Sequence, residues 1–147
     1  MNEYHFDLVN EPWIPCVRVD GTVEELGLRR VLEQAQEIKE IVDPSPLVTA
    51  SLHRLLLAIL HRNVGPKDRG AWEGLWQQDA FDMVQFDTYF THWYSRFDLF
   101  DAEYPFYQWP SLDFSGRGPI AKLTHEMAAG NNTTLFDHTT ERAGSTL

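Results

Sequence analysis

Cysteine and long hydrophobic runs are nearly absent from this sequence of 147 residues. Cys16 is the only cysteine, so no intrachain disulfide can form, and a buried, inert thiol in a reducing, cytoplasmic compartment is expected. The longest apolar run covers only residues 55–60, whereas a membrane-spanning helix needs about 18 or more apolar residues. We therefore expect no contact with a membrane.

Basic residues are also scarce. The sequence has 12 Lys and Arg against 22 Asp and Glu, which gives a formal net charge of −10. Free-standing nucleic-acid binding depends on Lys and Arg side chains that neutralise phosphates, so this composition argues against it. Any contact with nucleic acid must be local, or must use basic surfaces that other chains supply.

Residue sets typical of metal binding are missing as well. His53 and His61 share a predicted helix, but their spacing of eight residues separates them by about 12 Å along its axis. His125-Glu126 resembles the start of an H-E-x-x-H motif, but Ala129 stands where the second histidine is required. We therefore predict no metal, no cofactor and no enzymatic activity.

A β-hairpin is predicted for residues 6–28. Asp20-Gly21 lies between segments rich in valine, and this dipeptide is typical of a hairpin turn. Because Pro12 and Pro15 limit backbone pairing, the first strand is expected to be short or to lie at a sheet edge. We expect Trp13, between these two prolines, to pack under the hairpin.

The remainder of the chain is predicted to be mainly helical, which makes the fold class α+β. Apolar residues at helical spacing predict five helices, over residues 28–38, 46–63, 68–78, 80–98 and 119–129. Ser45 and Pro46 form a typical start for the second helix, whose apolar residues on nearly every side predict extensive burial. Aromatic residues make up 13% of the sequence, and most of them, including a stripe on the fourth helix, are expected in the core.

Residues 131–147 follow the predicted end of the last helix at Gly130 and have no helical period. We therefore expect a globular part over residues 1–130, then a loop at the end of a truncated or proteolysed chain. Short donors and acceptors such as Asn131, with an aromatic ring at Phe136, suit the recognition of single-stranded RNA. An ordinary polar loop after a helix cap is the alternative interpretation.

Five strings of residues, taken together, resemble one known family. They are, in chain order, FDLVNEPWIP (6–15), the helix segment 45–62, RFDLF with PFYQ (96–108), AKL (121–123) and GNNTTLFDH (130–138). Their order and spacing resemble the beginning of CasA, the large subunit of the type I-E CRISPR surveillance complex called Cascade. The resemblance implies that this chain is the N-terminal part of a larger mixed α/β domain.

The family resemblance also implies a function. CasA contributes to contact with the CRISPR RNA handle, to recognition of the PAM in double-stranded target DNA, and to recruitment of the helicase–nuclease. The implied partners are the CRISPR RNA, the target DNA, other Cascade subunits and that helicase–nuclease. The residues carried over to this role are Phe136, Asp137 and His138, while Asn131 and Asn132 are supporting candidates from their loop chemistry.

Two other interpretations remain open at this point. Residues 130–140 could pack against another protein, which would make the chain a structural interaction domain without direct nucleic-acid contact. A small hydrolase that uses Asp137 and His138 is a remote third interpretation, because adjacent loop residues do not by themselves form a catalytic triad.

Overall fold

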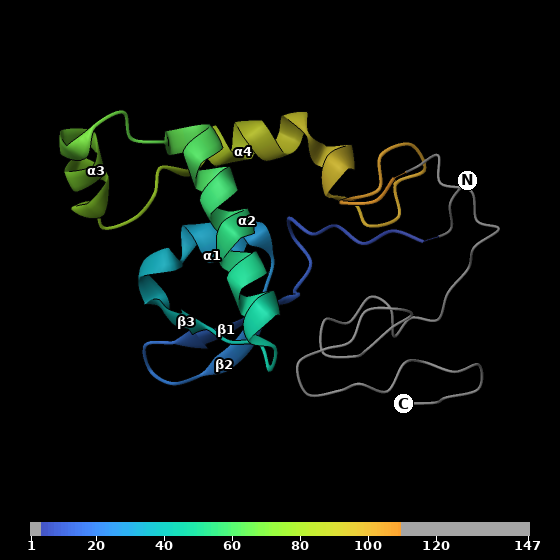
Figure 1. Cartoon of the computed structure of the whole chain (residues 1–147), viewed down its shortest axis with the longest axis horizontal. Coiled ribbons are helices and arrows are strands. Elements are labelled where there is room, and N and C mark those ends of the chain that lie inside the picture. The colour runs from blue at the N-terminus through green and yellow to red at the C-terminus, as the bar shows by residue number, and fades with distance from the viewer. Residues whose placement is uncertain (1–3, 110–147) are drawn as a thin grey trace, which may run out of the picture.

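The computed structural model describes residues 4–109, and in this range the fold is α+β, as predicted. A small sheet lies at one end of the molecule, and α2 runs from it toward α4 (Figure 1). No helix among the described residues is long and apolar enough to span a bilayer. The elements are β1 (Ile14–Arg18), β2 (Val23–Leu26), α1 (Leu28–Glu33), η1 (Ala35–Glu37), β3 (Ile38–Ile41), α2 (Pro46–Val64), α3 (Arg69–Trp76), α4 (Met83–His92) and η2 (Tyr94–Phe97).

The predicted hairpin is confirmed, and its turn is the expected one. β1 and β2 pair antiparallel, and Gly21 in the connecting turn has a φ of +87°, a conformation that glycine adopts without strain. β1 is short, as expected, but it is the central strand in the order β2-β1-β3 and not an edge strand. The sheet tolerates Pro15 because this residue lies where the pairing with β3 ends, so only one ladder bond is lost.

The third strand was not predicted, and the first helix is shorter than expected. Residues 28–38 were predicted as one helix, but α1 ends at Glu33, and Ile38 begins β3. Pairing with β1 places Ile41 opposite Cys16, where both side chains are buried. Burial against the sheet therefore outweighs the weak helical preference at the end of this segment.

The start of α2 is confirmed at Ser45, whose hydroxyl accepts a hydrogen bond from the backbone N–H of Val48 at 3.4 Å. The prediction of burial on most sides is wrong. Only one face of α2 is buried, through Leu52, Leu56 and Ile59. The opposite face remains exposed in the described part of the chain.

The aromatic helix is also shorter than predicted. α4 ends at His92, and a 3₁₀ turn, η2, follows it. Phe86, Phe90 and Phe97 are buried as expected, whereas Trp93 and Tyr94 are exposed. For residues 4–109, the prediction that most aromatic residues lie in the core is wrong, because nine of the 17 aromatic residues in this range are exposed: Tyr4, Trp72, Trp76, Trp93, Tyr94, Phe100, Tyr104, Tyr107 and Trp109.

Trp13 packs against the core as predicted, and its indole Nε1 donates a hydrogen bond to the carbonyl of Leu8 at 2.8 Å. The segment that contains Leu8 also pairs with a distant part of the chain. Leu8 donates its N–H to the carbonyl of Phe97 at 3.0 Å, and Leu99 donates to the carbonyl of Phe6 at 3.1 Å. These bonds join the beginning of the chain to the loop after η2.

Candidate interaction surface

The residues predicted to contact nucleic acid lie outside the described part of the chain. These residues are Asn131, Asn132, Phe136, Asp137 and His138, and the boundary expected at residue 130 lies outside it too. Their predicted role therefore stays a prediction. The helix predicted over residues 119–129 also falls outside the described range.

Within the described residues, the most distinctive polar junction is centred on Asp98. Its Oδ1 accepts hydrogen bonds from the backbone N–H groups of Phe6 at 3.0 Å and Phe100 at 2.9 Å. Its Oδ2 lies 2.5 Å from Nδ1 of His5. One carboxylate therefore fixes the first described residues to the loop that starts at residue 98.

The charges at this junction stabilise each other. Burial alone would raise the pKa of Asp98, but hydrogen bonds from Phe100, Phe6 and His5 outweigh it and hold the pKa below its usual value. The hydrogen bond to Asp98 is also the main cause that raises the pKa of His5. The ring of His5 further lies 3.4 Å from the hydroxyl of Tyr94.

The loop after Asp98 is held in a tight turn that exposes Tyr107. The N–H of Gln108 donates to the carbonyl of Pro105 at 3.0 Å, and the amide of Gln108 donates to the carbonyl of Leu99 at 2.8 Å. Tyr107 is the third residue of this turn and has a φ of +56°. Gly or Asn usually occupies the third position of a type II turn, because that position requires a positive φ. Its side chain is 90% exposed, so a strained backbone here presents an aromatic ring to the exterior.

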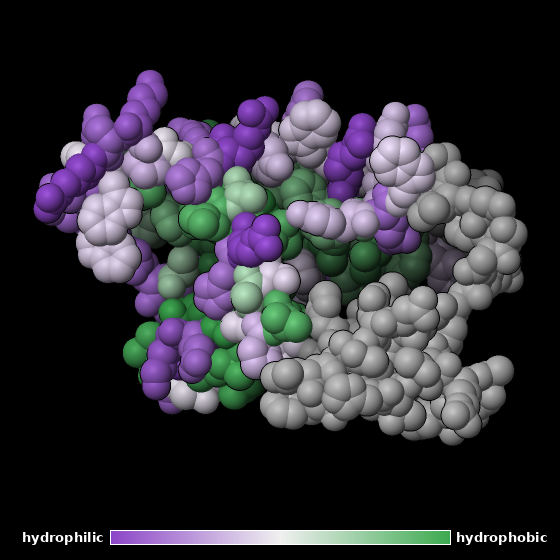
Figure 2. Space-filling model, in the orientation of Figure 1, coloured by the Kyte–Doolittle hydropathy of each residue, from purple (hydrophilic) through white to green (hydrophobic). Residues whose placement is uncertain are grey.

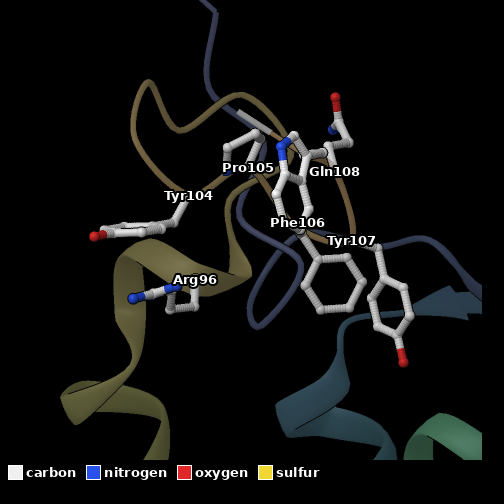
Figure 3. A pocket seen from close by; sticks show the side chains of 7 residues that line it. Arg96, Tyr104, Pro105, Phe106, Tyr107 and Gln108 are labelled. Carbon is white, nitrogen blue, oxygen red and sulfur yellow. The ribbon is translucent and has the colours of Figure 1, made fainter. Parts of the chain in front are cut away.

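Beside this turn, Arg96 stacks on an aromatic ring. Its guanidinium carbon lies 3.4 Å from the ring centroid of Tyr104 and 5.9 Å from that of Trp93. Figure 3 shows the guanidinium plane and the Tyr104 ring lying nearly parallel, while Tyr107 points away from both. A shallow hollow of about 420 Å³ is lined by Arg96, Tyr104 and Tyr107 together with Pro105, Phe106, Gln108 and Trp109.

This hollow has the composition of a protein-binding surface. Tyr, Trp and Arg are the residues most enriched where protein interfaces gain their affinity. Residues 93–109 contain a single basic side chain, Arg96, against the three carboxylates Asp98, Asp101 and Glu103. This balance disfavours phosphate contact at the loop. The sequence shows the aromatic residues of this loop, but the Arg96 stack and the strained turn at Tyr107 were not predicted from it.

A second hollow lies between α2 and the same loop. It has a volume of about 480 Å³ and a mostly apolar lining that includes Trp13, Leu55, Phe106 and Tyr107. Among the described residues that line it, Arg54 is the only charged one. The two hollows meet at Phe106 and Tyr107, which line both of them.

The described residues were predicted to hold no metal site, and their one cysteine was predicted to be inert. Among residues 4–109, no group of three or more His, Cys, Asp or Glu side chains is placed to hold a metal ion. Cys16 is fully buried, and burial together with the nearby Glu24 raises its pKa to about 11, as expected for an inert thiol. The exposed features of this region are suited to binding.

Comparison with known proteins identifies the family. The sequence profile of the CRISPR-associated protein Cse1 family matches residues 7–147. The chain is 44% identical over 140 residues to the CasA/Cse1 protein of Thermus thermophilus, which covers 92% of this chain and 27% of that protein. The chain therefore spans about a quarter of the length of this relative.

Solved structures agree in fold. Cse1 from Acidimicrobium ferrooxidans superposes with a TM-score of 0.75 at 40% identity, over 80% of this chain and 23% of the other. A chain of a CRISPR RNA-guided surveillance complex gives a TM-score of 0.75 at 29% identity, over 88% of this chain and 28% of that one. The profile match, the sequence identity and the shared fold together show that the chain belongs to the CRISPR-associated Cse1 (CasA) family.

Proposed function

We propose that this chain is part of the large subunit of a CRISPR RNA-guided surveillance complex of the Cascade type. The observation that carries the proposal is the family match over residues 7–147, together with the likeness to a chain of such a complex. The described contacts support it, because the family-like segments 6–15 and 96–108 are joined by hydrogen bonds at Asp98. Two of the strings that carry the resemblance therefore form one structural unit.

The proposed role is recognition without catalysis, in the cytoplasm. The subunit would contact the CRISPR RNA handle, recognise the PAM of double-stranded target DNA, and help to recruit the helicase–nuclease. In RNA-guided effectors, base pairing reads the target sequence while protein reads a short adjacent motif and the shape of the backbone. Such a division of labour requires no catalytic residue in this subunit.

The nucleic-acid contact is assigned to residues 131–138. Asn131 and Asn132 can donate to and accept from base edges and 2′-hydroxyls, and Phe136 can stack on an unpaired base. Asp137 and His138 complete the tripeptide carried over from the family resemblance. A chain with a net charge of −10 can take this role when neighbouring subunits supply the basic channel for the phosphates.

The test uses the full-length protein assembled with the other Cascade subunits and a CRISPR RNA. Phe136→Ala is expected to lower PAM-dependent binding of target DNA by about fivefold or more, since one stacked base contributes about 1–3 kcal/mol. Asn131→Ala is expected to lower it by about 2- to 12-fold, since one hydrogen bond contributes about 0.5–1.5 kcal/mol. Trp76→Ala is the matched control, because this exposed ring on α3 lies outside the predicted loop. Circular dichroism checks that each variant remains folded.

A structural interaction domain without nucleic-acid contact is the second candidate. The exposed Arg96–Tyr104 stack and the neighbouring Tyr107 ring favour it, because they have the composition of a protein interface. Unchanged PAM-dependent binding by both loop variants, with normal incorporation into the complex, would favour this candidate over nucleic-acid recognition.

A further inference from the structure

The hollow between α2 and the loop after Asp98 lies close to the point where the described residues end. Phe106 and Tyr107 form one of its walls, and Trp109 is the last described residue. An extended chain advances by at most about 3.6 Å per residue, so the covalent chain keeps residues 112–114 within about 18 Å of Trp109. The same polypeptide can therefore supply side chains to this hollow within a few residues.

The lining of the hollow is suited to apolar side chains and one carboxylate. Its lining is mostly apolar, and Figure 2 shows hydrophobic residues at the surface along α2. A volume of about 480 Å³ leaves room for two large side chains, since a cavity of roughly 150 Å³ already accommodates benzene. Within residues 4–109, the ion pairs that the structure forms leave Arg54, at this hollow, without a carboxylate partner.

The wall formed by Phe106 and Tyr107 is held in place by a strained turn. The two ring centroids lie 5.0 Å apart, and Figure 3 shows both rings extending from the same side of the loop. The positive φ of Tyr107 persists because Gln108 bonds to Pro105 and Leu99 on either side of it. The turn therefore presents a fixed aromatic wall to whatever enters the hollow.

The sequence directly after Trp109 matches these requirements. Leu112, Asp113 and Phe114 place one carboxylate between two large apolar residues. We call these three residues the anchor segment. In an extended backbone, Leu112 and Phe114 would share one face while Asp113 lies on the other. Two apolar side chains can then enter the hollow while the carboxylate stays at its rim, where the exposed Arg54 can reach it.

Covalent connection favours the anchor segment over other occupants. A separate subunit loses translational and rotational freedom when it binds, a cost that a tethered segment largely avoids. The entropy cost of closing a loop grows with its length, so residues three to five positions after Trp109 have an advantage over apolar residues farther along the polypeptide. The hollow is therefore assigned to its own chain.

We propose that the anchor segment docks in the hollow between α2 and the loop after Asp98. Leu112 and Phe114 bury against Leu55 and the Tyr107 ring, and Asp113 pairs with Arg54. This docking fixes the chain ahead of residues 131–138 and so positions that loop for nucleic acid. The positioning role rests on the proposed function, whereas the docking itself does not.

The first experiment locates the anchor segment by photo-crosslinking. The full-length protein carries a diazirine derivative of phenylalanine in place of Phe114 and is assembled with the other Cascade subunits and CRISPR RNA. After irradiation, mass spectrometry should locate an adduct on the lining of the hollow, for example on Leu55 or Ala58. The same derivative in place of Trp76, on α3, is the control and should give no adduct there. An adduct of residue 114 only with another part of the polypeptide, another subunit or RNA, or no adduct at all, overturns the inference.

The second experiment tests the positioning role. In the assembled complex, Leu112→Asp should incorporate normally but lower PAM-dependent binding of target DNA by about tenfold, because burial of one leucine side chain shifts an equilibrium by about that factor. Ser111→Asp adds the same charge one residue earlier and should bind as wild type. Leu112→Met, which keeps an apolar side chain of similar size, should also bind as wild type.

The outcomes separate the docking from the proposed function. If Leu112→Asp binds DNA as well as Ser111→Asp, or loses incorporation and DNA binding together, the positioning role is overturned. If Phe136→Ala and Asn131→Ala leave PAM-dependent binding unchanged, the proposed nucleic-acid contact fails, and the photo-adduct of residue 114 still decides whether the anchor segment occupies the hollow.

Discussion

Removing the Asp98 carboxylate should be among the most damaging single changes in the described part of the chain. Its side chain is only 13% exposed and accepts from the N–H groups of Phe6 and Phe100. A hydrogen bond to a charged group contributes about 1.5–3 kcal/mol, so Asp98→Ala should cost about 3–5 kcal/mol of the free energy of unfolding. That is a large fraction of the stability of a typical domain, about 5–15 kcal/mol.

Asp98→Asn is the matched control for this prediction. Asparagine keeps a carbonyl oxygen for both backbone donors but loses the charge and the oxygen that faces His5, so we expect a smaller cost of about 1–2 kcal/mol. Urea denaturation of the 147-residue chain at pH 7, followed by circular dichroism, measures both values. Unfolding free energies of Asp98→Ala and wild type that agree within about 0.5 kcal/mol would refute the reasoning.

The same junction predicts a pH dependence with a defined sign. Because the folded pKa of Asp98 is lowered from its usual value of 3.8, its ionised form adds to the free energy of unfolding above about pH 3.8. This stabilisation should be lost as the pH falls through the folded pKa. Because the folded pKa of His5 is raised from 6.5, its protonated form stabilises the folded chain fully below about pH 6.5. This stabilisation is lost as the pH rises through the folded pKa. The difference in stability between wild type and His5→Ala should therefore be largest near pH 5–6 and shrink above pH 7.

Three further predictions concern four positions: Gly27 with Gly74 as its contrast, Phe86, and Cys16. Gly27→Ala should lower the free energy of unfolding by about 2 kcal/mol or more, because a Cβ there would lie 2.6 Å from the carbonyl oxygen of Val9. Gly74→Ala should raise it by about 0.5–1 kcal/mol, because open space surrounds this position on α3 and alanine favours the helix. Phe86→Ala should cost about 3–5 kcal/mol in urea denaturation because its ring is fully buried; a cost below 1 kcal/mol would show that the site is loosely packed. Cys16 should resist a thiol reagent such as DTNB at pH 8 in the folded chain and react rapidly in urea.

The elements that sequence reasoning identified correctly are those fixed by nearby residues. Asp20-Gly21 determines the hairpin turn through a backbone conformation that glycine alone adopts freely. Ser45 and Pro46 determine the start of α2 through one hydrogen bond and one fixed dihedral angle. Each of these signals acts within four residues of the chain.

The elements that sequence reasoning missed depend on distant contacts. β3 forms because Ile41 packs beside Cys16, some 25 positions earlier, and no local pattern distinguishes that strand from a helix end. Helical spacing predicted α3, but it could not show that Trp72 and Trp76 stack on each other, with ring centroids 5.7 Å apart, on an exposed surface. The Asp98 junction joins residues more than 90 positions apart.

For the candidate site, the sequence was informative about family and less so about geometry. The strings at residues 6–15 and 96–108 led to the correct family, which the profile match confirms. The loop at residues 131–138 stays a prediction for nucleic-acid contact. The strained turn at Tyr107 and the stack of Arg96 on Tyr104 could not be predicted from the sequence, because both depend on how the loop folds back over η2.

The most direct test of the central claim is copurification of RNA with the full-length protein. An affinity-tagged full-length protein, isolated from cells that express the matching CRISPR array and the other subunits, should carry CRISPR RNA that is identified by sequencing. Recovery of the protein without CRISPR RNA, under conditions in which the other subunits retain it, would contradict the account.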